Sequence, residues 1–288
     1  MKFVLGGAFT PTAYLPELAI TADRNGWAMM AISDHTVSPE SVKAKYPYAA
    51  DGDRFWPPFT EWPDATVMMG AFSGLTKNLK FTTSVYVLPA RNPFHVANAF
   101  ATVSAISNNR VVLTIGVGWC KDEFDLLQQD FSTRGKRCDE MIEILRLLWT
   151  GEYVEYQGNH YQFDRVEINP RPTGNIPIWI GGNTEPALRR AARLGDGWMP
   201  AGLSASEIAD GVKRIRQYRG EYGRDPGGFD VMLSPKNESD RDGYKRLGDL
   251  GVTHIMTQPW RMYDAKPGDL QAMKDSVVRF SDEIISRF

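Results

Sequence analysis

The stretch PIWIGGNTEPALRRAARLGDGW, residues 177–198, decides the fold class of this 288-residue chain. Residues 176–180 form an apolar run typical of a buried strand, residues 184–194 have a helical pattern, and residues 197–200 form a second short strand. Parallel strands need a crossover connection between them, so a strand, a helix and a strand in this order predict a βαβ unit.

The same alternation continues in both directions from this unit. Expected strands cover residues 3–7, 27–33, 79–88, 111–117, 176–180, 197–200, 229–234 and 253–257. Expected helices cover residues 15–25, 64–75, 93–107, 133–149, 184–194, 206–222 and 239–250, with a last helix from about residue 269. This series of strand–helix units favours an α/β fold, a closed (β/α)8 TIM barrel forming one domain over residues 1–288.

An open doubly wound sheet is the competing architecture. It would need a glycine-rich turn directly after the first strand, and Gly6-Gly7 does not continue into a G-x-G-x-x-G fingerprint. The closed barrel is therefore the predicted fold.

Residues 151–175 interrupt the alternation. The segment EYVEYQGNHYQF (152–163) alternates in polarity and turns at Gly158-Asn159, and the following INPRPTGNIP (168–177) carries three prolines. We therefore expect a β-hairpin insertion after the fourth strand–helix unit.

The composition argues against several classes of protein. A formal net charge of −2 gives no reason to expect nucleic acid or an anionic membrane as a partner. No apolar run is long enough for a transmembrane helix. Cys120 and Cys138 are too few for a disulfide framework and are expected as free thiols in a reducing cytoplasm. No cluster of histidine, cysteine and aspartate has zinc-site spacing, so no metal is expected.

The active site of a barrel of this kind lies at the carboxyl ends of its strands. The second expected strand ends on AISDHT, residues 31–36, which places Asp34 beside His35. Of the four histidines, only His35 occupies such an end next to a carboxylate, and an imidazole can exchange a proton near neutral pH. His35 is therefore the predicted catalytic histidine, and the other three are expected to be structural.

Two glycine-containing loops are candidates for holding a ligand. Gly181-Gly182-Asn183-Thr184 lies between a strand and a helix, where free N–H groups favour a phosphate. An ordinary strand–helix loop has the same features, and spacing alone does not separate the two interpretations. Gly116 and Gly118 alternate at another strand end and also fit tight barrel packing. The residues alone thus predict a barrel enzyme with a phosphate-bearing ligand.

Four segments in order resemble the bacterial luciferase-like superfamily, and more closely its branch of F420-dependent (deazaflavin) oxidoreductases. They are AISDH (31–35), FTTSVYVLPARNP (81–93), ISNNRVVLTIGVGWCKDEF (106–124) and PIWIGGNTEPALRRAARLGDGW (177–198). The similarity runs from Phe3 to about Trp198, and the tail after Ala201 matches only loosely. The resemblance implies a TIM barrel, usually dimeric, that binds coenzyme F420 or FMN at its carboxyl-terminal mouth.

The resemblance also implies roles for individual residues. Ser84-Val85 matches a cis non-prolyl peptide whose bulge supports the cofactor ring. Asp34 matches an acidic residue beside that ring, and His35 matches a histidine near its hydride-carrying edge, so both are predicted to be catalytic. The other predicted cofactor-binding residues match loops that hold the ribityl and phosphate groups: Gly116, Gly118, Trp119, Glu123, Gly181, Gly182, Asn183 and Thr184.

One difference from the superfamily concerns the substrate. Its sugar-phosphate dehydrogenases carry an acidic proton donor soon after the glycine pair of the fourth strand, whereas Trp119 and Cys120 follow Gly118 here. We therefore do not expect sugar-phosphate oxidation. Aromatic residues follow His35 and suggest a flat apolar substrate, with a dimer contact or a packed cover as equal alternatives: Tyr46, Tyr48, Phe55, Trp56, Phe59 and Trp62.

Three functions are compatible with this sequence. The first is an oxidoreductase that transfers hydride between coenzyme F420 and a small organic substrate. The second is a luciferase-type monooxygenase that uses reduced FMN from a partner flavin reductase. The third, a non-catalytic flavin-binding protein, is disfavoured by the Asp34-His35 pair. We expect a cytoplasmic homodimer in each case.

Overall fold

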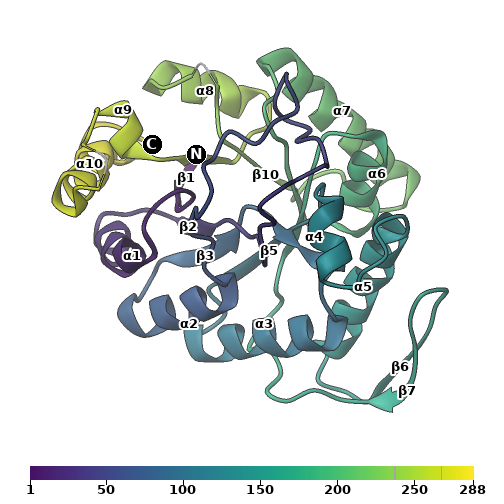
Figure 1. Cartoon of the computed structure of the whole chain (residues 1–288). Helices are drawn as coiled ribbons and strands as arrows, with labels where there is room; N and C mark the ends of the chain where they lie inside the picture. The colour runs from purple at the N-terminus through teal and green to yellow at the C-terminus, as the bar shows by residue number, and fades with distance from the viewer. Residues whose placement is uncertain (237, 267) are drawn as a thin grey trace.

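A closed ring of parallel strands forms the centre of the protein (Figure 1). The computed structural model describes residues 1–236, 238–266 and 268–288. Neighbouring strands pair in the order β3-β2-β1-β11-β10-β9-β8-β5-β4, and pairing of β3 with β5 closes the ring. The strands are β1 (Lys2–Gly6), β2 (Met29–Ile32), β3 (Lys80–Thr83), β4 (Tyr86–Val87), β5 (Val111–Gly116), β8 (Ile178–Gly181), β9 (Gly197–Met199), β10 (Asp230–Leu233) and β11 (His254–Thr257). β3 and β4 both pair with β5 and together form one strand of the barrel, so the nine strands occupy eight positions. The predicted (β/α)8 barrel is therefore confirmed.

Side chains alternate along each strand between the barrel interior and the surrounding helices. On β1, Val4 belongs to the interior cluster, whereas Phe3 and Leu5 belong to the larger cluster beneath the helices. Trp179 of β8 and Met232 of β10 fill the interior in the same way. Because both faces are buried, the strands appear in the sequence as continuous apolar runs.

Helices cover the outside of the barrel, as Figure 1 shows. Side-chain caps fix several of their starts: Asp64 accepts hydrogen bonds from the N–H groups of Thr66 and Val67, and Ser204 forms a capping box with Glu207. The outer helices are α1 (Leu15–Arg24), α2 (Ala65–Leu75), α3 (Pro93–Ser107), α5 (Arg134–Leu148), α6 (Glu185–Leu194), α7 (Ala205–Glu221), α8 (Arg241–Asp249) and α10 (Leu270–Glu283). All of them were predicted, with ends within about two residues of those observed.

The third barrel strand differs from its prediction. It was expected to be continuous over residues 79–88, but it divides into β3 and β4 at the Ser84–Val85 peptide bond, which is cis. The cis bond implied by the family resemblance is thus confirmed. Two short helices, α4 (Lys121–Leu126) and α9 (Pro259–Met262), were missed because so few residues show no periodic pattern.

The predicted hairpin is present between α5 and β8. Strands β6 (Val154–Gln157) and β7 (Gln162–Val166) pair antiparallel and project from the ring of helices (Figure 1). Glu140 on α5 accepts hydrogen bonds from the N–H groups of Asn159, His160 and Tyr161, so the hairpin turn is fixed to the barrel.

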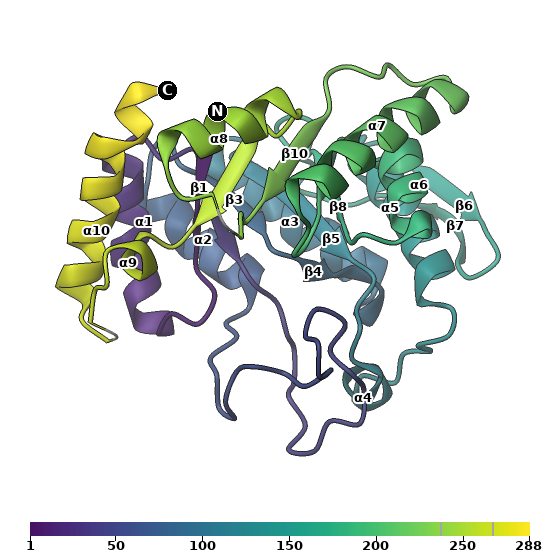
Figure 2. The same cartoon turned by 90° about the horizontal axis from the view of Figure 1, so that it is seen from above.

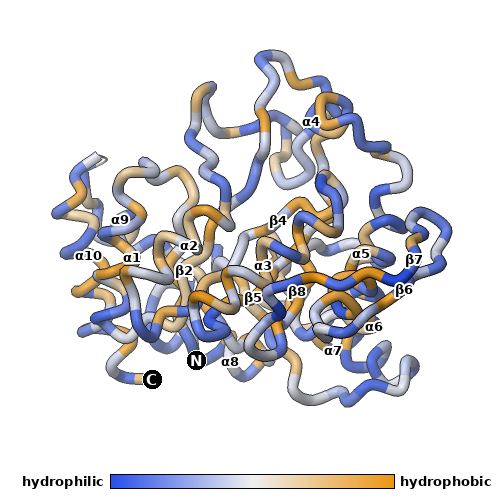
Figure 3. The backbone as a smooth tube through the Cα atoms, turned by 90° about the horizontal axis from the view of Figure 1, so that it is seen from below, coloured by the Kyte–Doolittle hydropathy of each residue, from blue (hydrophilic) through white to orange (hydrophobic). Residues whose placement is uncertain are grey.

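A long segment without helix or strand joins β2 to α2 across residues 33–64. Figure 2 shows it projecting together with α4 from one side of the barrel, and Figure 3 shows apolar and polar residues interspersed along it. The side chains of Asp122 and Glu123 on α4 accept hydrogen bonds from the backbone N–H groups of Thr36, Val37, Lys43 and Ala44. The short helix therefore anchors the first part of the segment. Within the described residues, no helix has the length and apolar character needed to cross a bilayer.

Candidate active site

The predicted site residues come from the carboxyl ends of four barrel strands. Asp34 and His35 follow β2, Ser84 and Val85 separate β3 from β4, and two further loops follow β5 and β8. Because parallel strands end on the same side of a barrel, the fold brings these four segments to one mouth. The long segment after β2 lies on the same side and covers part of that mouth (Figure 2).

Asp34 is buried, and both oxygens of its carboxylate accept hydrogen bonds from other residues. Its Oδ1 lies 2.7 Å from Nη2 of Arg91, and its Oδ2 lies 2.8 Å from Nη1 of the same residue. The N–H of Val87 donates a third hydrogen bond, of 2.9 Å, to Oδ2. Arg91 also lies over the ring of Tyr86, with its guanidinium carbon 4.2 Å from the ring centroid. The carboxylate thus ties the end of β2 to β4 and to the segment after it.

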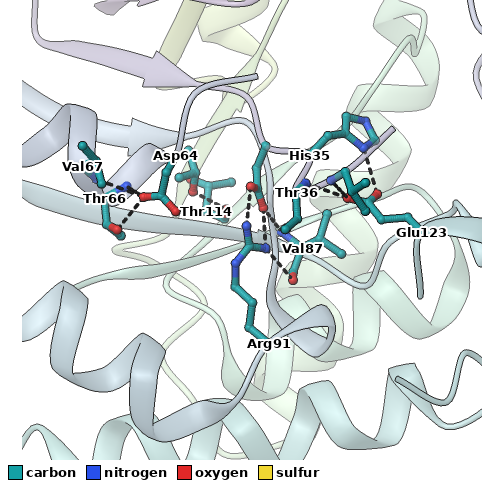
Figure 4. Close-up of polar contacts among 12 residues, drawn as sticks. His35, Thr36, Asp64, Thr66, Val67, Val87, Arg91, Thr114 and Glu123 are labelled. Carbon is teal, nitrogen blue, oxygen red and sulfur yellow. Dashed lines mark hydrogen bonds and ion pairs between the residues drawn. The ribbon is translucent and has the colours of Figure 1, made fainter. Parts of the chain in front are cut away.

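His35 has a different partner from its sequence neighbour. Its Nδ1 lies 2.9 Å from Oε2 of Glu123, and Oε1 of Glu123 accepts hydrogen bonds from Thr36 and Val37. Figure 4 shows the His35 ring facing Glu123, while Arg91 reaches the backbone of Val87 elsewhere in the site. Asp34 and His35 are adjacent in the chain, yet they belong to two separate polar pairs.

The surroundings of Glu123 keep it ionised. Burial alone would raise the pKa of its carboxyl, but the His35 ring and the N–H groups of Thr36 and Val37 outweigh burial, so its pKa is lowered. A carboxylate can only accept hydrogen bonds, so Nδ1 of His35 carries a proton and donates it. Nε2 is left as the ring atom that can take up or release a proton.

Aromatic rings surround His35. Ring centroids lie 5.0 Å away for Trp62, 5.7 Å for Trp56 and 6.2 Å for Trp119. Tyr46 lies 5.1 Å from both Trp56 and Trp119, so the segment after β2 and the loop after β5 meet over the histidine. The predicted aromatic segment therefore packs beside His35.

The glycines at the strand ends make room for Val85. A Cβ added to Gly116 would lie 2.6 Å from Cγ2 of Val85, and one added to Gly181 would lie 2.7 Å from its Cγ1. Gly118 has a φ of +82° and lies against Val87 and Phe124. The sequence alone is compatible with either packing or ligand binding at these glycines. Their neighbours in the structure identify a packing role for Gly116 and Gly181.

The loop after β8 combines an unusual backbone with an uncapped helix. Gly182 has a φ of +110°, and its carbonyl accepts a hydrogen bond of 2.8 Å from Nε1 of Trp198. The Asn183 side chain is engaged with the backbone of Ala201 through two hydrogen bonds. Thr184 is the N-cap of α6 but its side chain makes no capping hydrogen bond, so the first N–H groups of α6 have no side-chain partner there.

The structure thus brings some of the predicted residues together and separates others. Val85 contacts Gly116 and Gly181, and His35 contacts Glu123. Glu123 was predicted to help hold the cofactor chain, whereas both its oxygens bind His35 and the neighbouring backbone. Arg91 was not predicted as the partner of Asp34, although it lies only four residues after Val87 at the end of β4.

The comparisons with known proteins agree with this fold. Residues 4–237 match the family described as luciferase-like monooxygenase. The uncharacterized protein Rv0940c of Mycobacterium tuberculosis is 34% identical over 291 residues, which cover 100% of both chains. The chain therefore belongs to the luciferase-like monooxygenase family, and the predicted resemblance is confirmed.

Other relatives carry more specific names. The F420-dependent glucose-6-phosphate dehydrogenase of Nakamurella multipartita is 28% identical over 94% of this chain and 75% of the relative. Among solved structures, the coenzyme F420-dependent tetrahydromethanopterin reductase of Methanopyrus kandleri has a TM-score of 0.77 at 15% identity, covering 100% of this chain and 99% of that one. The monooxygenase RslO1 of Streptomyces bottropensis also has a TM-score of 0.77, at 17% identity, with the same coverage. At such identities, the two structures establish the shared fold.

Proposed function

We propose that this protein is an F420-dependent oxidoreductase that transfers hydride between coenzyme F420 and a small organic substrate. The observation that carries the proposal is a histidine, His35, held by Glu123 under aromatic cover at the mouth of a luciferase-like barrel. The F420-dependent dehydrogenase among its sequence relatives supports this cofactor.

His35 is the proposed proton-transferring residue. Bound F420 would supply a ring carbon that accepts or donates a hydride, and His35 would take up or release the proton that accompanies this hydride. Glu123 fixes the imidazole through Nδ1, so Nε2 is the ring atom left to exchange the proton. Asp34 has no free oxygen for this task; we infer that it positions β4 through Arg91 and Val87.

The residues present fit a cofactor with a flat ring and a phosphate. Val85, seated between Gly116 and Gly181, is proposed to support the ring, with Ser84 beside it. The loop Gly181–Thr184 and the uncapped start of α6 suit a phosphate, because backbone N–H groups there lack side-chain acceptors. Gly118 and Trp119 would border the chain that joins the ring to the phosphate.

The FMN-dependent monooxygenase is not favoured as an alternative. FMN also has a flat ring and a phosphate, so the fit of the loops does not distinguish the two cofactors. Two sequence relatives are F420-dependent glucose-6-phosphate dehydrogenases, which favours F420. A partner flavin reductase is needed only in the FMN case, and a homodimer remains a prediction that sedimentation velocity can check.

Cofactor titration tests the proposal directly. We expect oxidised F420 to bind, and its own visible absorbance reports the binding. FMN should bind at least about tenfold more weakly, a difference of about 1.4 kcal/mol in binding free energy. Tighter binding of FMN would instead move the protein to the monooxygenase class. Binding of neither compound would remove the cofactor assignment altogether.

Two variants then separate binding from turnover. His35→Ala should bind F420 normally but lose at least about 100-fold in F420 oxidation or reduction with any substrate found by screening. His95→Ala, on an exposed position of α3, is the matched control and should keep its activity. Gly182→Val should weaken F420 binding, because the +110° backbone angle disfavours a branched side chain.

A further inference from the structure

Residues 38–63, the central part of the segment between β2 and α2, lie over His35, and we call them the lid. Two indole rings of the lid, those of Trp56 and Trp62, have centroids 5.7 Å and 5.0 Å from the His35 ring. The side chain of His35 is only 16% exposed, and Trp56 is buried beside it. In this arrangement the lid restricts access to the histidine.

The lid is held together by hydrogen bonds within itself. The N–H of Tyr46 donates to the carbonyl of Gly52 at 2.7 Å, and Nη1 of Arg54 donates to Oγ of Ser38 at 2.8 Å. Figure 2 shows the segment that contains the lid as a folded loop beside α4. Because these bonds join distant parts of the lid, it can move as one unit.

Two carboxylates attach the lid to the barrel, one on each side of β2. On α4, which follows β5, Oδ2 of Asp122 accepts hydrogen bonds from the N–H groups of Lys43 and Ala44, at 3.1 Å and 2.9 Å. On the lid itself, Oε2 of Glu61 accepts a hydrogen bond of 2.7 Å from the N–H of Thr12, in the segment after β1. In the part of the chain that the structure describes, these three bonds are the hydrogen bonds that join the lid to other residues.

Both carboxylates are stabilised in their ionised form by these bonds. The N–H of Ala44 lowers the pKa of Asp122, and the hydrogen bonds from Thr12 lower the pKa of Glu61. Hydrogen bonds to an ionised acceptor are stronger than those between neutral groups. Each carboxylate is therefore suited to hold one side of the lid.

Aromatic contacts add to this attachment without fixing it. The ring of Phe9, after β1, lies 5.5 Å from that of Phe55 on the lid. Phe55 is 66% exposed and Phe59 is fully exposed, so part of the aromatic surface of the lid already faces water. Apolar rings can separate without leaving a buried polar group unpaired, so their separation avoids that penalty. The two carboxylates are thus the specific points at which the lid is held.

We propose that the lid opens to admit the cofactor and the substrate to His35 and closes again over them, and that Asp122 and Glu61 are the latches that hold it closed. The inference rests on the proposed function, because it takes His35 as the residue that these ligands must reach. A closed lid excludes water from the proton transfer, and an open lid allows the ligands to exchange.

The test uses diethyl pyrocarbonate, which acylates the histidine nitrogens that it can reach and needs no cofactor. Peptide mass spectrometry gives the reaction rate of His35 and that of His95, an exposed histidine on α3 that serves as the internal control. We expect His35 to react more slowly than His95 in the native protein. Asp122→Ala and Glu61→Ala should each raise the His35 rate about three- to tenfold, because the loss of a latch hydrogen bond increases the open fraction. The His95 rate should stay unchanged.

Matched controls remove a carboxylate without removing a latch. Asp125→Ala removes an exposed pair with Lys121 on α4, and Glu40→Ala changes an exposed residue of the lid. Both controls should leave the His35 rate unchanged. Asp122→Asn keeps an oxygen that can accept the hydrogen bonds, so it should raise the rate less than Asp122→Ala does.

Several results would overturn the inference. Equal reaction of His35 and His95 in the native protein would show that the lid does not shield His35. An unchanged His35 rate in both latch variants, or an equal rise in the control variants, would exclude Asp122 and Glu61 as latches. A rise that extends equally to His95 would assign the effect to a general loosening of the fold.

The same samples with F420 separate this inference from the proposed function. F420 binding, with no effect of the latch variants on His35, leaves the cofactor assignment standing and removes the lid. A latch effect on His35 in a protein that does not bind F420 does the reverse. If both proposals hold, F420 should slow the acylation of His35, because cofactor and closed lid then cover it together.

Discussion

Oε2 of Glu123 lies 2.9 Å from Nδ1 of His35, although 88 residues separate the two along the chain. The carboxylate comes from α4 after β5, and the histidine from the end of β2. This contact joins two of the loops at the barrel mouth and fixes which nitrogen of His35 remains open. We regard it as the central relationship of the site.

The first prediction concerns the pH dependence of stability. The pKa of Glu123 is lowered from its ordinary value of 4.5, so its ionised form stabilises the fold above that pH. This contribution is lost as the pH falls through the lower pKa of the folded state. Glu123→Gln should therefore be less stable than the native protein at pH 7, and the difference should shrink below pH 4.5. Urea unfolding at several pH values measures it; a difference that does not change with pH contradicts the pairing.

The second prediction concerns the buried pair of Asp34 and Arg91. Arg91→Met leaves the Asp34 carboxylate buried without its cation, which should cost about 3–5 kcal/mol of unfolding free energy. The double variant with Asp34→Asn should lose less than the sum of the single losses. Arg279→Met, in the exposed pair with Glu283, is the control and should cost less than about 1 kcal/mol. If both variants lose the same unfolding free energy, the buried pair of Asp34 and Arg91 stabilises the fold no more than the exposed pair does.

The third prediction concerns the packing of Val85. Gly116→Ala places a Cβ 2.6 Å from a methyl group of Val85, so it should destabilise the protein by about 1–3 kcal/mol. Adding Val85→Ala removes that methyl group and should restore part of the loss. Gly70→Ala on α2, where a Cβ meets nothing within 4 Å, should stabilise the helix slightly. Thermal unfolding compares the three; no rescue in the double variant would exclude Val85 as the cause.

The fourth prediction concerns His254 at the start of β11. Burial, with Lys2, Lys80 and the N-terminus nearby, lowers the pKa of His254 to about 3. The unfolded chain binds a proton there at higher pH than the folded protein, so stability falls as the pH drops below 6.5. Between pH 7 and pH 5 this histidine should account for a loss of about 2 kcal/mol. His254→Gln should remove that part of the pH dependence; an unchanged urea-unfolding profile would contradict it.

The sequence predicted the fold well because each barrel strand is a short apolar run next to a helical pattern. The break in the third strand was implied only by family resemblance, since TTSVYV has the composition of an uninterrupted strand. Helix α4 is too short to show a periodic pattern, and its role depends on distant partners: Asp122 and Glu123 bind backbone N–H groups of the segment after β2.

The sequence predicted which residues lie at the candidate site, but it did not predict which of them contact one another. The pattern at the end of β2 identified Asp34 and His35, but their adjacency suggested one shared function. In the structure each residue contacts a different loop, Asp34 the segment after β4 and His35 the loop after β5. Such pairings depend on how barrel loops meet in space, and the spacing of residues along the chain carries no record of that.

The filled interior of the barrel has a kinetic consequence. Val4, Trp179 and Met232 are all buried there, so ligands at the mouth exchange through the face on which they entered. Any ligands that bind at this mouth therefore share one entrance, and a ligand nearer to solvent is expected to slow the exchange of a deeper one.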